Sequence, residues 1–101
     1  MNSYLSQFDW DGLEVVKLVG TGLQDGDFNR LLNALVHTHV HSLLLPGNEL
    51  QEISLDALAN YMALNKHLKV VSLQRNNIHP LSGNVRAKMT FLKSKGLSLY
   101  L

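Results

Sequence analysis

Apolar residues recur along this chain on one pattern, LxxLxLxxNxL, at a spacing of 27 to 28 residues. The pattern fits residues 13–23, 40–50 and 68–78. Its fourth and sixth positions have the period of two of a strand, so the residues there face the same way. These apolar pairs are Val16/Leu18, Leu43/Leu45 and Val71/Leu73. Self-similarity of this kind is typical of stacked repeats.

A helical period follows each predicted strand. Apolar residues at i, i+3, i+4 and i+7 predict one buried helix face in each unit. They are Phe28, Leu31, Leu32 and Leu35 in the first unit, and Leu55, Leu58, Ala59 and Met62 in the second. Asp27, Ser54 and Ser82 are the predicted N-caps. In the last unit the apolar residues are Val85, Met89 and Leu92, which are not at the strictly periodic positions, so this unit is expected to be rotated or lengthened.

The asparagine at the ninth position of the pattern predicts a structural role. Its side chain is short enough for a turn and polar enough to satisfy backbone groups that a stack of turns would leave unpaired. Asn48 and Asn76 are therefore expected to form a ladder between units, with Thr21 in the equivalent place of the first unit.

With these motifs the chain resembles the leucine-rich repeat proteins, in particular the ribonuclease-inhibitor-like class with repeats of about 28 residues. The class pattern LxxLxLxxNxLxxxGxxxLxxxLxxxxxL is matched by Leu43, Leu45, Asn48, Leu50, Leu58, Met62 and Leu68, while Ser54 replaces the usual glycine. The resemblance is strong over residues 13–80 and weak over 81–101. It implies an α/β fold, a short solenoid with parallel strands on a concave face and helices on a convex face.

The length of 101 residues predicts a single domain, residues 1–101. Within it we expect an N-terminal cap over residues 1–12, three repeats over 13–80 and a C-terminal capping repeat over 81–101. Four large apolar residues suggest the cap: Tyr4, Leu5, Phe8 and Trp10. The last strand is expected to point either Leu97/Leu99 or Leu99/Leu101 inward, and the sequence leaves both registers open.

Composition restricts the compartment and the chemistry. The chain has no cysteine, which excludes disulfides, a zinc ribbon and a thiol nucleophile and suits a reducing compartment. Its first residues lack the pattern of a signal peptide, and no segment is apolar enough to span a membrane. We therefore expect a cytoplasmic protein. Short free-standing repeats of this class also resemble the effectors of intracellular bacteria, which implies delivery into a host cell as one route.

Charge is divided sharply along the sequence. All 8 acidic residues precede residue 57, whereas residues 57–101 contain most of the 9 basic residues and no acid. Such a division favours steering of a charged partner, or head-to-tail contact between copies as a self-assembling structural module. Another alternative is nucleic-acid binding, with an affinity that falls steeply with salt. The basic residues for it are Lys69, Arg75, Arg86, Lys88, Lys93 and Lys95.

Candidate sites for chemistry are weak. Gly20, Gly22 and Gly26 lie between a strand and a helix, but their GxGxxxG spacing is not that of a dinucleotide-binding turn and favours simple turn geometry. His37, His39 and His41 alternate at a helix-to-strand junction without a cysteine or carboxylate to complete a metal site. No catalytic group of residues is recognisable, so we expect no metal, no cofactor and no enzyme activity.

The predicted concave face is the candidate binding site. Apolar residues occupy several of its outward positions and polar residues surround them, as in a protein-binding surface. The predicted partner-binding residues are Val15, Lys17, Val19, Ser42, Leu44, Pro46, Glu49, Val70, Ser72, Gln74, Arg75, Asn77 and Tyr100. The sequence thus predicts a non-catalytic protein-interaction module, in its sharpest form an inhibitor that covers the site of a partner enzyme.

Overall fold

The computed structural model describes residues 14–101, in which short strands alternate with helices. The elements are β1 (Val15–Lys17), α2 (Asp25–Leu35), β2 (Ser42–Leu44), α3 (Ile53–Leu64), β3 (Val70–Ser72), α4 (Gly83–Ser94) and β4 (Ser98–Tyr100). The predicted N-terminal cap, residues 1–12, lies outside the described residues. The described part of the chain therefore consists of three strand–helix units and a fourth strand.

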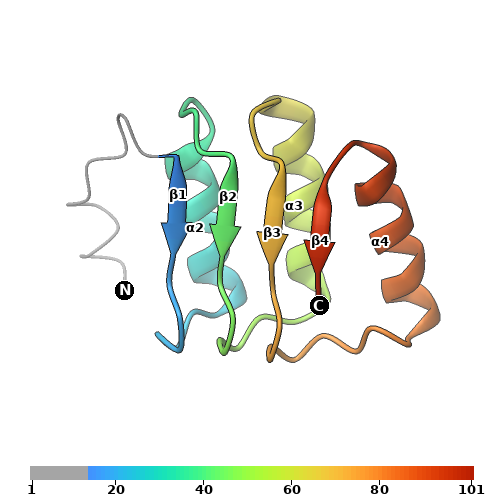
Figure 1. The fold of residues 1–101 in the computed structure, drawn as a ribbon. Helices are drawn as coiled ribbons and strands as arrows, with labels where there is room; N and C mark the ends of the chain where they lie inside the picture. The colour runs from blue at the N-terminus through green and yellow to red at the C-terminus, as the bar shows by residue number, and fades with distance from the viewer. Residues whose placement is uncertain (1–13) are drawn as a thin grey trace.

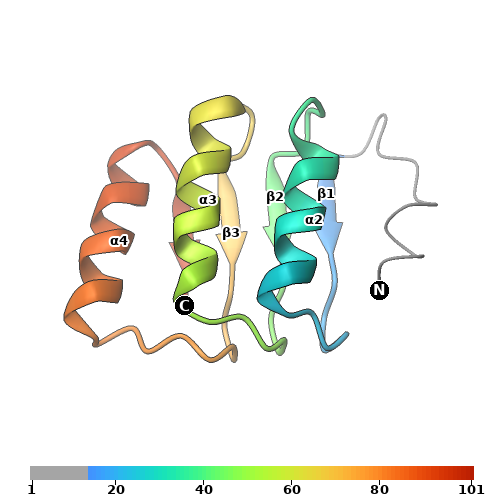
Figure 2. The ribbon, with the colours of Figure 1, turned by 180° about the vertical axis from the view of Figure 1, so that it is seen from behind.

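The four strands form one parallel sheet in the order β1-β2-β3-β4 (Figure 1). Val16 pairs with Leu43, Leu43 with Val71 and Val71 with Leu99. The cross-strand pairs therefore join the residues that the 27 to 28 residue spacing aligned. All three helices cover the same face of the sheet, as the view from behind shows (Figure 2). The opposite face carries no element of the described chain.

The hydrophobic core lies between the sheet and the helices. The inward residues of the strands and the predicted apolar faces of α2 and α3 meet there, and nearly all of them are buried. Leu18 and Ala59 are partly buried at its margin. Removal of these aliphatic side chains from water is the main force that holds each unit against the next.

The last unit departs from the strict repeat as the sequence predicts. Val85 and Leu92 of α4 are buried, and Met89 packs partly against the core. Since Leu99 pairs with Val71, Leu99 and Leu101 follow the places of Val71 and Leu73 in the preceding unit. Leu97 is buried as well, so the two alternatives for the last strand describe one row of inward residues.

Side-chain amides connect the ends of neighbouring strands, as the predicted asparagine ladder requires. Asn48 Oδ1 accepts hydrogen bonds from the backbone N–H groups of Thr21 and Leu23, each at 3.0 Å. Its Nδ2 donates to the carbonyl oxygens of Leu18 at 2.7 Å and Leu45 at 3.1 Å. Each amide thus satisfies backbone groups of its own unit and of the preceding one.

Asn76 repeats this arrangement one unit further along. Its Nδ2 donates to the carbonyl oxygens of Leu45 and Leu73, each at 3.0 Å, and its Oδ1 accepts from the Leu50 N–H at 3.0 Å. In the first unit Thr21 contributes a hydroxyl that donates to Asn48 Oδ1 at 3.1 Å. The ladder predicted from the sequence is confirmed.

A second polar cluster, which the repeat pattern does not reveal, lies at the opposite end of the helices. The buried Asn65 donates through Nδ2 to the carbonyl oxygens of Val36 at 3.0 Å and Thr38 at 3.1 Å. The hydroxyl of Tyr61 donates to the Leu35 carbonyl oxygen at 3.0 Å. These bonds satisfy carbonyl groups at the end of α2, which have no partner inside the helix, and one in the loop that follows it.

The predicted N-caps are only partly correct. Ser82 precedes α4 as expected, but α2 begins at Asp25 and α3 at Ile53. Asp27 instead lies in the first turn of α2, where its carboxylate accepts a hydrogen bond from the Gln24 N–H at 3.0 Å. Ser54 lies inside α3 and its hydroxyl donates to Asp25 of the preceding unit. Asp27 and Ser54 thus lie within the first turn of their helices, and each helix begins earlier than the predicted cap implies.

We expect Asn48→Ala to destabilise the fold strongly. The substitution leaves two N–H groups and two carbonyl groups without their side-chain partner, at positions that are buried or partly buried. Each buried group costs about 1–3 kcal/mol when it stays unpaired. Allowing for rearrangement and water entry, we expect a total loss of about 2–5 kcal/mol in the free energy of unfolding. Urea denaturation followed by circular dichroism measures it.

Asn77→Ala is the matched control, because Asn77 has the same side chain and adjoins Asn76 but is exposed. It should change the free energy of unfolding by less than about 0.5 kcal/mol. Equal losses in the two variants would show that the amide ladder does not hold the units together.

The buried hydroxyl of Tyr61 should make the free energy of unfolding decrease at alkaline pH. Burial raises the pKa of its hydroxyl from 10.0 to about 12. Between pH 10 and 12 the folded chain keeps the Tyr61 proton while the unfolded chain loses it. The contribution of Tyr61 to the free energy of unfolding is therefore complete below about pH 10 and is lost as the pH rises towards 12. Tyr61→Phe should therefore flatten the decline in urea midpoint over that range. Tyr100→Phe, at an exposed strand position, should retain the decline, and an unchanged slope in Tyr61→Phe would contradict this role.

Candidate functional site

The face of the sheet opposite the helices, called here the open face, carries the outward residues of all four strands. The register places Val15, Ser42, Val70 and Ser98 in one row and Lys17, Leu44, Ser72 and Tyr100 in the next. All of these residues except Ser98 are among the partner-binding residues predicted from the sequence. Parallel strands in register thus bring residues that are far apart in the sequence onto one surface (Figure 1).

Apolar side chains are exposed on the open face to an unusual extent. The exposed fractions are 44% for Val15, 46% for Val19 and 53% for Tyr100. Leu44 and Val70, on the two central strands, are partly exposed between them. An apolar stripe therefore crosses the sheet from β1 to β4, where a surface exposed only to water would favour polar residues.

Ser42 is a predicted partner-binding residue that is buried in the structure. It lies on the open side of β2, but its exposed fraction is only 8%. The valines that pair with it on both sides, Val15 and Val70, flank its short side chain, and its Oγ lies 2.8 Å from Nδ1 of His41. Ser42 can therefore support the surface but offers little of its own area to a partner.

The loops that follow the strands form the polar margin of the open face. Glu49, Gln74, Arg75 and Asn77 are exposed there, and Pro46 is partly exposed. Backbone hydrogen bonds continue the parallel ladder into these loops, from the Gly20 N–H to the Pro46 oxygen and from the Gly47 N–H to the Gln74 oxygen. The margin is thus held by the sheet rather than by independent loops.

Three equivalent loop positions share one unusual backbone conformation. Gly20 has a φ of 60° and Gly47 a φ of 71°, in the left-handed region that favours glycine. This geometry accounts for Gly20 of the GxGxxxG segment, and Gly22 likewise has a positive φ of 73°. The third position holds Arg75, with a φ of 58°, and among residues 14–101 no other non-glycine residue has a positive φ. Arginine at this place is strained where glycine would not be.

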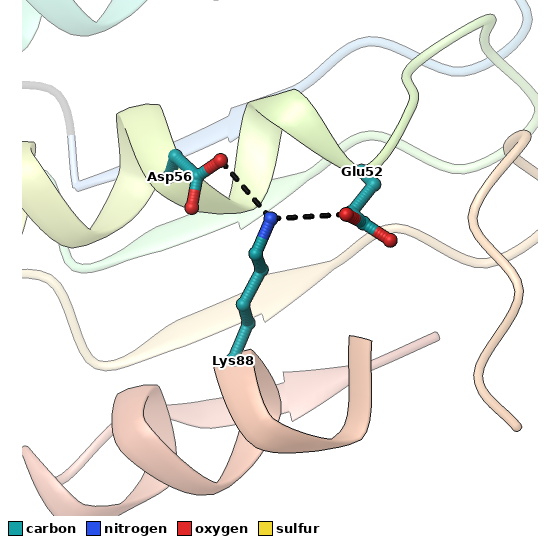
Figure 3. Close-up of polar contacts among 3 residues, drawn as sticks. All are labelled: Glu52, Asp56 and Lys88. Atoms are coloured by element: carbon teal, nitrogen blue, oxygen red, sulfur yellow. Dashed lines mark hydrogen bonds and ion pairs between the residues drawn. The ribbon is translucent and has the colours of Figure 1, made fainter. Parts of the chain in front are cut away.

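The basic residues of α4 do not all face water as the sequence suggested. Nζ of Lys88 lies 3.1 Å from Oε2 of Glu52 and 3.1 Å from Oδ2 of Asp56, both of which belong to the start of α3 (Figure 3). Hydrogen bonds to Asp56 and Glu52 raise the pKa of Lys88 above its ordinary value. Lys88 therefore ties α4 to α3 and is not available to a nucleic acid in the way that the sequence suggested.

The histidines do not assemble a metal site within the described part of the chain, where no group of three or more potential ligands of this kind occurs. The rings of His39 and His67 meet edge to face with centroids 4.5 Å apart. His41 instead contacts Ser42. The alternating histidines of the sequence therefore point to different neighbours.

Sequence reasoning missed one feature, a groove of about 360 Å³ between α3 and α4. Lys66, Lys69 and Lys95 lie around it, together with Phe91. The absence of acidic residues after residue 56 was the available signal, but the repeat pattern does not show which lysines the fold brings together.

Among residues 14–101, no helix combines the length and the apolar character needed to cross a bilayer. No protein-family model matches the chain. No curated protein matches it either.

Among solved structures, the chain is similar to that of the leiomodin-1 actin-binding site 2. The TM-score is 0.63 at 16% sequence identity, over 83% of this chain and 64% of the other. The chain thus spans a little less than two thirds of the length of that structure, and a likeness at this identity shows a shared fold.

Proposed function

We propose that this chain is a non-catalytic protein-interaction module of the leucine-rich repeat type, in the ribonuclease-inhibitor-like class, and that it binds a partner protein through its open face. The single observation that carries the proposal is the apolar stripe across all four strands. Exposed apolar area surrounded by polar residues is the usual composition of a protein-binding surface. Val15, Val19, Leu44, Val70 and Tyr100 form this stripe.

Arg75 gives independent support at the margin of the stripe. A non-glycine residue in the left-handed conformation lowers the stability of the fold by about 1–3 kcal/mol, and such strain is concentrated at functional positions. Glycine occupies the two equivalent loops, so the conformation itself does not require an arginine. Arginine and tyrosine are also the residues that most often carry binding energy at interfaces. We therefore assign Arg75 and Tyr100 as the main contacts beside the apolar stripe.

The class of partner follows from the shape of the surface. A module that binds a partner over a broad exposed stripe acts most simply by covering a site on that partner, and inhibition of a cognate enzyme is the sharpest form of the proposal. The structural neighbour is named as an actin-binding site, which supports protein binding as the general role. Actin is accordingly the first defined partner to test. A bacterial effector role and a cytoplasmic location stay predictions from the sequence.

Nucleic-acid binding receives less support from the arrangement of the basic residues. Lys88 is held by two carboxylates, and Lys69 and Arg75 lie beyond opposite ends of β3. Binding to a phosphate backbone requires basic groups along one track. The apolar stripe of the open face also fits a protein surface better than a polyanion.

The proposal is tested by changing the open face without changing the fold. Leu44→Arg places a charge in the centre of the stripe, and Arg75→Glu reverses the charge at its margin. Both should fold normally, and each should weaken partner binding at least tenfold, as expected when an interface residue worth about 2 kcal/mol is lost. Co-sedimentation with actin filaments, followed by affinity capture from lysate with identification by mass spectrometry, measures the binding.

Lys93→Glu is the matched control, because this exposed residue lies on α4, on the other side of the molecule. It should retain the partner that the wild type captures. If Leu44→Arg and Arg75→Glu fold and still capture that partner as the wild type does, the open face is the wrong surface.

Arg75→Gly separates the structural from the binding role of the strained position. Glycine adopts the observed φ of 58° without steric cost, so the variant should be more stable by up to about 1 kcal/mol while it loses partner binding. Gln74→Gly, at a neighbouring position without a positive φ, should instead be destabilised by about 0.5–1 kcal/mol. A loss of stability in Arg75→Gly equal to that in Gln74→Gly would contradict backbone strain at Arg75.

A further inference from the structure

The interface between α3 and α4, called here the seam, changes in character along its length. At one end Lys88 binds Glu52 and Asp56. Beyond them on α3 come Ala59 and Ala63, at helical spacing on the same face. Alanine side chains are too short to fill the space between two helices, so the seam opens there into the groove of about 360 Å³.

The floor of this seam groove is aliphatic and deep. Met62 has an exposed fraction of 9% and Leu68 one of 2%, so both belong to the core while they line the groove together with Ala59 and Ala63. Phe91 of α4 forms one wall and keeps an exposed fraction of 51%. A bound alkyl chain could cover this apolar area without displacing any element of the fold.

The rim of the seam groove is cationic. Lys66 and Lys69 follow α3, and Lys95 follows α4 with its Nζ 5.3 Å from the centre of the Phe91 ring. Within residues 14–101 none of these three lysines forms an ion pair, and the carboxylates of the seam, Glu52 and Asp56, lie at its other end and are held by Lys88. The C-terminal ends of two helices contribute about −0.5 charge each, which offsets only about a third of the lysine charge.

The groove between α2 and α3 provides a contrast within the same molecule. It has a volume of about 230 Å³ and its lining contains no charged residue. Tyr61 occupies that interface and donates its hydroxyl to the Leu35 carbonyl oxygen. The combination of an open aliphatic floor and a cationic rim is therefore a property of the α3–α4 seam and not of helix pairs in this fold generally.

We propose that the seam groove binds a medium-chain fatty acid, with the alkyl chain on the aliphatic floor and Phe91, and the carboxylate among Lys66, Lys69 and Lys95. The volume lies near the lower end of the range of about 300–1,000 Å³ for small-molecule sites, which are mainly apolar with a few polar groups that fix orientation. A neutral lipid would leave the charge of the three lysines unneutralised, and a cationic one would be repelled. The seam groove is separate from the open face, so this proposal does not depend on the proposed protein-binding role.

Titration of the isotope-labelled chain with sodium decanoate below its micelle concentration, followed by amide NMR shifts, tests the proposal. We expect saturable shifts centred on the amides of Ala63, Asn65, Lys66 and Lys95. The double variant Lys66→Gln/Lys95→Gln should weaken binding by about tenfold or more, because each lysine offers a charge-assisted hydrogen bond. Lys93→Gln, on the same helix but outside the groove lining, should bind as the wild type does.

Filling the space gives a second, independent test. Ala63→Leu should fill the groove and abolish the saturable shifts, whereas Ala57→Leu, in the α2–α3 groove, should leave them unchanged. Thermal unfolding verifies that the variants are folded, and Phe91→Ala, which removes the exposed wall, replaces Ala63→Leu if that variant does not fold.

Three outcomes would overturn the assignment. Shifts that do not saturate, or that persist in folded Ala63→Leu, would show that decanoate does not occupy the seam groove. Binding of decyltrimethylammonium as tight as that of decanoate would exclude recognition of the carboxylate. Binding of an acidic amphipathic peptide in the groove without binding of decanoate would make the seam a peptide-docking surface instead.

Discussion

The structure depends on the need to satisfy backbone groups where one unit of the chain lies against the next. Short strands of three residues leave many N–H and carbonyl groups in the turns that follow them, and water cannot reach those that the stack covers. Asn48 and Asn76 supply the missing donors and acceptors, each to its own unit and to the one before. Asn65 does the same for the carbonyl groups at the end of α2. With these groups paired, the leucines of successive units can pack in one core.

The parts of the fold that follow from local periodicity were predictable from the sequence. Val16, Leu43 and Val71 were aligned by spacing alone, and they pair in the sheet, because units of nearly equal length that stack in parallel bring equivalent residues side by side. The same argument placed Leu44 beside Lys17 and Ser72 on the open face. A period of two and a period of 3.6 are properties of the chain itself, so no knowledge of the neighbouring unit is needed to read them.

Features that arise between units were not predictable in this way. Ser54 resembles a helix cap in sequence, but its hydroxyl donates a hydrogen bond to Asp25 of the preceding unit, and α3 begins two residues earlier than such a cap predicts. Lys88 resembles a free basic residue in sequence, but the packing of α4 beside α3 brings it to Glu52 and Asp56 (Figure 3). The burial of Ser42 and the opening of the seam groove likewise depend on what the adjacent strand or helix contributes. The apolar periodicity identifies a helix or strand, whereas contacts between residues 25 or more positions apart determine which of its side chains are buried or hydrogen-bonded.

The strand register and the asparagine bridge recur between units, and this repetition has a consequence for how such a chain can change in length. Each strand adds to the sheet with the same parallel register, and each asparagine bridges to the unit before it in the same way. A duplicated block of one strand and one helix could therefore be inserted between two existing units and meet surfaces that already fit it. An insertion of a single residue within a strand would instead turn the following inward residues outward. Evolution of this architecture is thus expected to proceed by gain or loss of whole blocks, which lengthens or shortens the sheet while its chemistry per unit is preserved.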